Sequence, residues 1–396
     1  GEVNFGAAPV DCPDLASYNL FEDASDPRST PNSGGVPFVL NSKLFSDYSL
    51  KYRVLYLPPG SKAVYRDAGG SDPNTAIAFP VGTIIAKTFA FNDGGDEESI
   101  ETRLLIKRTT PNGSVRWAGS AYIWEDDGNG GKVAKLARIG DKAAVSWNFE
   151  DPETGTTHTG STDSYLIPTQ SQCQSCHANL DGDPGAAPIG PKVRNLNRPY
   201  QSESPAQTDQ AAHPSAGLNQ IQYWCENGIL SGCPSNLGVD PTTQIATNLE
   251  RVAKFNVPGS SGHPAGSDED IESRARAWLE VNCQHCHNNK GFAANTGFYL
   301  DVFRPVNTSY GICKGPTATG AEGSGGRAVD IHPANAAASI LEYRISEEAD
   351  SAAARMPPIA RSVVDVEGHA LIEQWINDVI VVDESRYPGS SDCTGE

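Results

Sequence analysis

Methionine is almost absent from this chain of 396 residues, because Met356 is the only one. Any site that needs a thioether can therefore use only this side chain. Long apolar runs are also missing, and no stretch approaches the roughly 18 apolar residues of a membrane-spanning helix. Basic residues are outnumbered, with 30 Lys and Arg against 49 Asp and Glu, so the net charge is −19. This charge disfavours nucleic acid and anionic lipid as partners and suits cationic ones.

The chain combines a modest apolar content with many turn-forming residues. Hydrophobic residues make up 38%, and there are 39 Gly and 28 Pro. Together with the length, this composition predicts two or three loop-rich domains with substantial β content. The sequence begins Gly1-Glu2-Val3 without an initiator Met or a signal peptide, which is typical of the mature form of an exported protein.

Two short cysteine motifs are the most specific feature: Cys173-Gln174-Ser175-Cys176-His177 and Cys283-Gln284-His285-Cys286-His287. Cys-x-x-Cys-His is the attachment signature of a c-type haem, in which two thiols bond to the porphyrin and the imidazole binds iron. One tight turn places both sulfurs at the macrocycle edge and the next side chain at the iron. Chance predicts about 0.004 copies at this composition. The alternatives are a zinc half-site and a redox dithiol, but we expect two covalently bound c-type haems.

Five of the nine cysteines lie outside these motifs, namely Cys12, Cys225, Cys233, Cys313 and Cys393. Cys225 and Cys233 close a short loop that contains two glycines, so they are expected to form a disulfide. A further bridge must be drawn from the other three, which leaves one thiol that stays free or cross-links chains. Covalent haem and this cysteine usage both indicate an oxidising compartment, so we expect a periplasmic or extracellular protein.

The first part of the chain predicts β-structure. Residues 1–35 are rich in Pro, Ser, Asp and Gly and predict an extended arm. A β-rich domain is expected over residues 36–180, ending in the first motif. Its strands are recognised by β-branched and aromatic residues between turn sequences. The expected strands span residues 51–57, 77–91, 100–107, 115–124 and 143–149.

A composition change marks the middle of the chain. Residues 181–268 are rich in Pro, Asn, Gln and Ser. Trp224 and two cysteines favour a connector packed between two haem domains over a flexible linker. Residues 269–384 are predicted to form a helical domain, and residues 385–396 a tail.

Helical periodicity marks the C-terminal part. The acidic residues Asp268–Asp270 favour a helix start, and apolar residues recur at helical spacing up to Cys283. Shorter helices are expected over residues 336–346 and 366–380. A helix that enters the motif, a methionine near the end and a closing amphipathic helix resemble a class I cytochrome c domain. In that fold the first and last helices cross beside the haem.

Other stretches resemble two further families. FPVGTIIAKTF and TRLLIK, followed by a Trp/Tyr strand and the first motif, resemble the cytochrome P460 and cytochrome c′-β group of small β-sheet haem domains. Stretches spread over nearly the whole chain resemble a family of exported bacterial dihaem cytochromes of undefined role: FSDYSLKYRVLYLPPGSKA, FPVGT, IGPKVRNLNR, RAWLEVNCQHCHN and GRAVDIHPANAAASILEYR. The predicted fold class is α+β and multidomain, with a β-rich N-terminal haem domain followed by an α-helical class I cytochrome c-like domain.

The second haem has few candidate ligands. His287 is its proximal ligand by the motif, and Met356 stands in Arg355-Met356-Pro357-Pro358, just ahead of the last expected helix. Class I cytochrome c domains, which this part resembles, place the distal methionine in such a loop. A core gap-filler is the alternative role for Met356. His/Met ligation raises the reduction potential and favours electron transfer over substrate chemistry.

The first haem takes His177 as its proximal ligand, but no second methionine is left for the other face. The candidates are His158, His213, another histidine or an open site. The resemblance to the P460 group implies an open, five-coordinate iron. His285 is expected to face solvent as a spacer within its motif. The other histidines are His263, His332 and His369.

These features predict an electron carrier without catalytic residues, a dihaem relay between redox partner proteins outside the cytoplasmic membrane. One alternative is self-association into a polymeric extracellular filament that conducts electrons from haem to haem. Another is a peroxidase-like enzyme in which the second haem feeds an open first haem. That reaction needs a distal acid–base pair, which no motif identifies.

Overall fold

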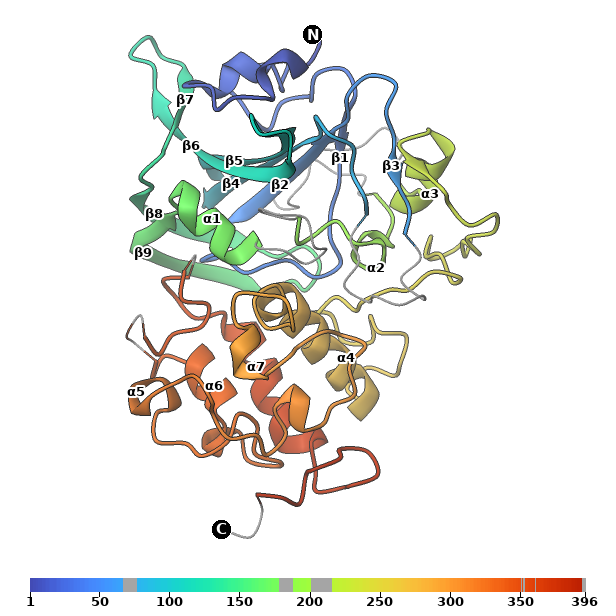
Figure 1. Ribbon diagram of the computed structural model, residues 1–396, viewed down its shortest axis with the longest axis vertical. Coiled ribbons are helices and arrows are strands. Elements are labelled where there is room, and N and C mark those ends of the chain that lie inside the picture. The colour runs from blue at the N-terminus through green and yellow to red at the C-terminus, as the bar shows by residue number, and fades with distance from the viewer. Residues whose placement is uncertain are drawn as a thin grey trace. The chain divides into compact units, whose positions relative to one another are not determined.

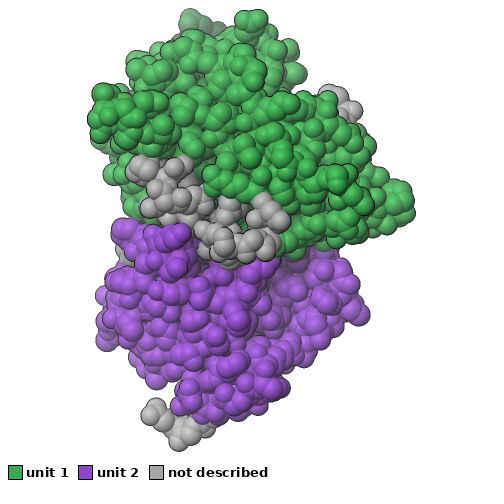
Figure 2. Space-filling model, turned by 45° about the vertical axis from the view of Figure 1, so that its right-hand side comes forward, with its two compact units in different colours: residues 1–41, 48–251 green, residues 42–47, 252–396 purple. Residues whose placement is uncertain are grey.

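The computed structural model describes residues 1–66, 77–177, 188–200, 216–349, 351, 353–359 and 361–393. The chain divides into two compact units, coloured separately in Figure 2. Unit 1 consists of residues 1–41 and 48–251, and unit 2 of residues 42–47 and 252–396. The main division therefore falls inside the predicted connector. Among the described residues, no helix is both long and apolar enough to span a bilayer.

Unit 1 is built on an eight-stranded sheet (Figure 1). Its main path has the order β1-β2-β4-β5-β6-β7 with antiparallel neighbours, and β8 pairs with β9 and with the end of β4. A separate parallel pair joins β3 to β10. The strands are β1 (Gly35–Pro37), β2 (Leu50–Tyr56), β3 (Ala63–Val64), β4 (Ile84–Asp93), β5 (Asp96–Thr109), β6 (Val115–Asp126), β7 (Lys132–Leu136), β8 (Asp141–Glu150), β9 (Thr157–Ile167) and β10 (Leu230–Ser231).

The strands form where β-branched and aromatic residues recur along the sequence. The predicted strand regions correspond to β2, β4, β5, β6 and β8, which confirms them. The sequence pattern does not predict β7 or β9. Strand β9 reads THTGSTDSYLI, and most of its residues are polar, so it carries little of the apolar alternation that identifies a strand.

The two faces of the sheet bury different parts of the chain, since alternate residues of a strand point to opposite faces. One face carries Val54, Ile84 and Leu104, which share a cluster of buried residues with Tyr18 and Leu20. The segment predicted as an extended arm therefore contributes to the core of unit 1.

The opposite face packs in part against the connector. Leu55 and Trp117 share a core cluster with Trp224 of helix α3 (Gln220–Glu226). The indole N–H of Trp224 donates a hydrogen bond to the Tyr200 hydroxyl at 2.7 Å. This part of the connector is therefore packed into unit 1.

Unit 2 is centred on the packing of helix α4 (Asp268–Leu279) against helix α7 (Val366–Gln374) (Figure 1). A Cβ atom on Gly368 would lie 2.1 Å from Trp278 Nε1, so this glycine permits the close approach of the two helices. The Trp278 indole donates to Asp365 Oδ2 at 2.8 Å, and Asp365 also caps α7 by accepting from the Gly368 N–H. The other α-helices of the described residues are α1 (Gln170–His177), α2 (Val193–Leu196), α5 (Ala321–Ser324) and α6 (Ile340–Ile345).

Segment 42–47, from the first part of the chain, belongs to unit 2. The backbone N–H of Phe45 donates to Asn282 Oδ1 at 2.8 Å. Asp47 accepts from the N–H groups of Ser362 and Val363 at 2.7 and 3.0 Å. The segment thus bonds both to the residue before the second motif and to the loop before α7.

The predicted fold class, α+β with an α-helical class I cytochrome c-like domain, is wrong. The largest assembly of secondary structure is a mostly antiparallel sheet of eight strands in unit 1, and only 21% of the described residues are helical. Helices do form at the predicted positions 268–279, 340–345 and 366–374. The long stretches between them contain many Gly, Pro and Asn residues, which favour turns, so the periodic segments do not extend into a helical domain.

Two disulfides form, and one is the predicted Cys225–Cys233 pair. The second joins Cys313 to Cys393, which leaves Cys12 as the free thiol outside the two motifs. Both bridges lie within single units. They agree with the sequence-based prediction of a second bridge and one odd thiol.

Loss of the long-range disulfide is expected to destabilise the protein more than loss of the short one. The bridges join residues 80 and 8 positions apart, and a cross-link restricts the unfolded chain more when the loop is longer. The double variant Cys313→Ser/Cys393→Ser should lose about 4.5 kcal/mol of unfolding free energy, and Cys225→Ser/Cys233→Ser about 2.5 kcal/mol. Urea denaturation of both variants checks this, and a reversed order would contradict it.

Candidate functional site

The second motif lies on the C-terminal continuation of α4. Ser267 caps this helix, since its Oγ accepts from the Asp270 N–H at 3.3 Å, and the acidic first turn suits the positive end of the helix dipole. After Leu279 the chain continues in a π-helical turn, Glu280–Gln284, which contains Cys283. Such turns are frequent at functional sites.

A single tight turn holds the three reactive residues of the second motif together. The backbone N–H groups of Cys286 and His287 both donate to the Cys283 carbonyl, at 3.1 and 2.9 Å. Both cysteines are thiols, because neither forms a disulfide. Burial raises the pKa of the Cys283 thiol to about 12, and the Arg361 charge acts in the opposite direction. The turn therefore presents two sulfurs and one imidazole.

The imidazole of His287 has one ring nitrogen committed to the protein. Its Nδ1 lies 3.3 Å from the Phe298 carbonyl oxygen, and the Phe298 ring packs edge-on with 5.2 Å between ring centroids. Burial lowers the pKa of His287 to about 4, so the ring is neutral at physiological pH. Because a carbonyl can only accept, Nδ1 carries the proton and Nε2 keeps its lone pair. This is the tautomer that metal-binding histidines adopt.

Met356 lies in a loop that is tied to α6. Its backbone N–H donates to the Arg344 carbonyl at 2.8 Å. The Arg344 guanidinium bonds back to the same loop, since its Nε donates to the Ala354 carbonyl at 2.8 Å. At the other end of the loop, Arg361 donates to the Ile345 carbonyl at 2.6 Å. The loop is therefore fixed at both ends against one helix.

The same two arginines connect the Met356 loop to the second motif. Besides burial, the Arg344 charge lowers the pKa of His287. The Arg361 charge opposes the rise that burial causes in the pKa of Cys283. Such effects require short separations in a folded protein. Arg344 and Arg361 therefore act both on the loop that carries Met356 and on residues of the second motif, and ligation of iron by Met356 stays a prediction.

His285, expected to face solvent, is buried, with only 3% of its surface exposed. No described residue forms a hydrogen bond with its Nδ1 atom. The expectation of a solvent-facing spacer is therefore wrong. The prediction assumed that the middle residues of such a motif are exposed, as they usually are. Their exposure depends on how the rest of the chain packs, which the motif does not encode.

The first motif lies in α1, which begins at a capping box. Thr169 Oγ1 accepts from the Gln172 N–H at 3.1 Å, and the Gln172 side-chain oxygen accepts from the Thr169 N–H at 2.9 Å. This reciprocal pair follows directly from the sequence Thr-Gln-Ser-Gln. The helix ends at His177, which is partly exposed.

Helix α1 packs on β6, where the strand has a glycine. A Cβ atom on Gly119 would lie 2.8 Å from Cys173 Cβ and 3.3 Å from its Sγ, so Gly119 makes room for the thiol. Burial raises the pKa of Cys173, and the Arg103 charge acts against this rise. Each motif therefore places its first cysteine in a buried position close to an arginine.

The predicted distal ligands of the first haem are described only in part. His158 lies in β9 next to the rings of Tyr48 and Phe149, at centroid distances of 4.9 and 5.3 Å. His213 lies outside the described residues. Aromatic packing accounts for the position of His158, so its ligation of iron stays a prediction.

Sequence reasoning missed a group of cationic side chains within the sheet. Arg53 of β2, Lys87 of β4 and Arg103 of β5 occupy one cross-strand row on the face that also carries Gly119. The signal was present in the sequence as Lys or Arg among β-branched and aromatic residues, as in KYRVLY and IIAKTFAF. Charged residues in such positions are rarely buried unless they have a partner.

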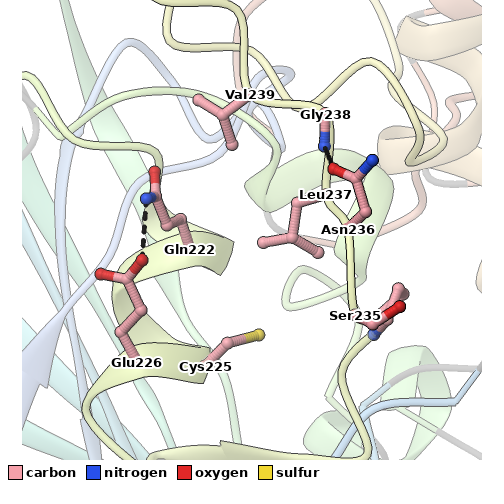
Figure 3. A pocket seen from close by; sticks show the side chains of 9 residues that line it. Gln222, Cys225, Glu226, Ser235, Asn236, Leu237, Gly238 and Val239 are labelled. Carbon is pink, nitrogen blue, oxygen red and sulfur yellow. Dashed lines mark hydrogen bonds between the residues drawn. The ribbon is translucent and has the colours of Figure 1, made fainter.

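A pocket of about 380 Å³ lies in the connector beside the Cys225–Cys233 disulfide (Figure 3). On one side of it Gln222 of α3 donates to Glu226 at 2.8 Å, and on the other side the Gly238 N–H donates to Asn236 Oδ1 at 2.9 Å. None of the predicted site residues lines this pocket. Its polar groups bond to one another and therefore indicate no ligand.

His369 of α7 and Glu342 of α6 form a pH-dependent pair, with 2.8 Å between His369 Nε2 and Glu342 Oε1. The hydrogen bond to Glu342 raises the pKa of His369. A raised pKa means that the pair stabilises the fold below the unfolded-state pKa of about 6.5 and that this contribution disappears as the pH rises through the higher folded-state value.

Replacing this histidine is therefore expected to have an effect only at acidic pH. His369→Gln should lower the unfolding free energy by about 0.5–1 kcal/mol near pH 5.5 and leave it unchanged near pH 9. Glu342→Gln serves as the matched variant and should give the same pH profile. Denaturation curves at several pH values check this, and a loss that persists at alkaline pH would contradict it.

No family model, curated protein or solved structure matches this chain. The functional inference therefore depends on the residues of the chain itself. The strongest of these observations is the turn that holds Cys283, Cys286 and His287 together, with the Nδ1 atom of His287 directed at a backbone carbonyl.

Proposed function

We propose that this protein is a dihaem c-type cytochrome that relays electrons between partner proteins outside the cytoplasmic membrane. The observation that carries the proposal is the second motif, where two thiols and a neutral imidazole with an available Nε2 come from one turn. A covalently attached haem supplies a one-electron redox centre that protein side chains do not provide. The motif pattern also supports membership in the exported dihaem cytochromes that the sequence resembles.

The ligands of the second haem determine its role. His287 Nε2 and the Met356 thioether would bind the iron of a haem attached at Cys283 and Cys286. The Met356 loop supports this assignment, because hydrogen bonds at both ends hold it against α6 next to the arginines that act on the motif. Two protein ligands leave no position for a substrate, so this centre transfers electrons only.

The first haem is attached through Cys173 and Cys176, with His177 as its proximal ligand. Its other face is closed by a histidine, either His158 or His213, or shielded by apolar side chains. Closure suits a relay, because an iron exposed to water and oxygen would lose electrons to side reactions. Two disulfides are compatible with the oxidising compartment in which such proteins mature.

Electron paramagnetic resonance of the oxidised protein tests the proposed relay. Two low-spin ferric signals are expected, together with a reduced protein that does not bind carbon monoxide. A high-spin signal from the first haem with carbon monoxide binding would instead support the peroxidase-like alternative. Elemental analysis separates both from the zinc alternative, since it should find two iron atoms per chain and no zinc.

A further inference from the structure

Three cationic side chains lie directly opposite one another across three neighbouring strands. Arg53 of β2 pairs with Lys87 of β4, and Lys87 pairs with Arg103 of β5. Like charges in directly opposed positions destabilise a sheet. A row of this kind therefore needs a reason other than the stability of the sheet itself.

The row borders an aromatic ring and a buried carboxylate. The Lys87 ammonium lies 4.5 Å and the Arg103 guanidinium carbon 4.1 Å from the centroid of the Phe89 ring. Glu101 is fully buried, and its carboxylate accepts from Arg103 Nε at 2.9 Å and from the Tyr165 hydroxyl at 2.8 Å. Glu101 is therefore engaged by Arg103 and Tyr165.

Lys87 stands in the middle of this positive field. Burial holds the pKa of Lys87 well below its ordinary value, and the charges of Arg53, Lys51 and Arg103 add to this effect. The Glu101 charge raises the pKa of Lys87, but this effect is smaller than the lowering by burial and the neighbouring cations. An anionic group bound beside Lys87 would stabilise its charged form.

The row begins next to the first haem-attachment motif. Gly119 and Ala121 of β6 pair with Leu105 and Arg103 of β5, so all four residues lie on one face of the sheet. Cys173 packs on Gly119 and is close enough to Arg103 for the guanidinium charge to act on its thiol. Because neighbouring strands are about 4.8 Å apart, the row extends roughly 10 Å from Arg103 to Arg53.

We propose that Arg53, Lys87 and Arg103 form the binding site for the two propionate carboxylates of the haem that is attached at Cys173 and Cys176. This inference rests on the proposed function. A haem carries its thioether-forming groups and its propionates on different edges, so a cationic row that starts near the attachment cysteine and leads away from it matches that distribution. Phe89 is fully buried and packs against the Lys87 and Arg103 side chains of the row.

Charge-removing variants of the complete holoprotein test this assignment. Lys87→Gln and Arg53→Gln are compared with Lys142→Gln, which removes the same charge from an exposed position of β8. The two row variants should keep both haems and shift the reduction equilibrium of the first haem about tenfold toward the oxidised form, or about 59 mV for a one-electron couple. The uncompensated carboxylate causes this shift, because its negative charge stabilises ferric iron. Lys142→Gln should leave the equilibrium unchanged.

Vibrational spectra identify the groups involved. Resonance Raman bands of the propionates of the first haem should move in Lys87→Gln and return in Lys87→Arg, which restores the charge. If Lys87→Gln does not fold, the shift of the propionate bands is measured in Arg53→Gln instead. Unchanged bands and potentials in a protein that carries two haems would overturn the propionate assignment alone. Absence of the first haem from the wild-type protein would instead overturn the proposed function.

The alternative ligand of the cationic row is a small anion from solution, such as a free carboxylate or phosphate ion. Addition of inorganic phosphate at constant ionic strength is expected to leave the potential of the first haem unchanged in both the wild type and Lys87→Gln. A phosphate-dependent shift in the wild type that disappears in Lys87→Gln would overturn the assignment, because the row would then be open to ions from solution.

Discussion

Met356→Ala is expected to remove the weak long-wavelength absorption of thioether-ligated ferric haem and to lower the potential of the second haem by on the order of 0.1 V or more, since axial ligands set haem potentials over a range of about 0.8 V. Met356 is the only methionine of the chain, so no other thioether can replace it. The loop that carries it is anchored independently of its side chain, by the backbone bond to Arg344 and by Arg361. The substitution should therefore change the iron ligand without unfolding the loop.

The control for this variant is Pro358→Ala, which shortens an exposed side chain in the same loop. It should leave both the absorption band and the potential unchanged. Redox titration followed by visible absorption measures both quantities. A Met356→Ala protein with a wild-type spectrum and potential would show that this side chain is not an iron ligand.

Removal of the first pair of motif cysteines is expected to abolish one haem and keep the other. In Cys173→Ala/Cys176→Ala, the Cys173 thiol that packs on Gly119 and the Cys176 thiol are lost, while the second motif and its core cluster in unit 2 are unchanged. The matched variant Cys283→Ala/Cys286→Ala should likewise retain one haem, with the spectrum of the first site. Loss of both haems from either variant would contradict independent sites in the two units.

These variants are best made in the complete chain. A fragment limited to residues 269–384 would lack segment 42–47, whose Phe45 and Asp47 bond to Asn282 and Ser362. It would also lose the Cys313–Cys393 disulfide. A fragment that failed to bind haem would therefore report on missing structure and not on the motif.

Local features of the fold could be predicted from the sequence. Strand β4 and its neighbours have dense β-branched and aromatic residues, and α4 has a serine cap, an acidic first turn and helical periodicity. The Cys225–Cys233 bridge follows from short spacing around two glycines. Each of these signals lies within a few neighbouring residues, which is why it can be read directly.

Features that depend on distant residues could not be predicted. Segment 42–47 joins unit 2 through bonds to residues more than 200 positions away, and no local pattern marks it. The burial of His285 and the row formed by Arg53, Lys87 and Arg103 likewise require the tertiary arrangement. The fold class was wrong because three short helices, α4, α6 and α7, were extended to a whole helical domain, although turn-rich sequence separates them.

Mass spectrometry of the intact, denatured protein tests the central claim most directly. Covalent thioether bonds survive denaturation, so the proposed dihaem cytochrome should have the mass of the polypeptide plus two haems, and the denatured chain should keep haem absorption. Trypsin digestion should place one haem on the peptide with Cys173 and Cys176 and the other on the peptide with Cys283 and Cys286. A denatured chain with the mass of the polypeptide alone would contradict the account.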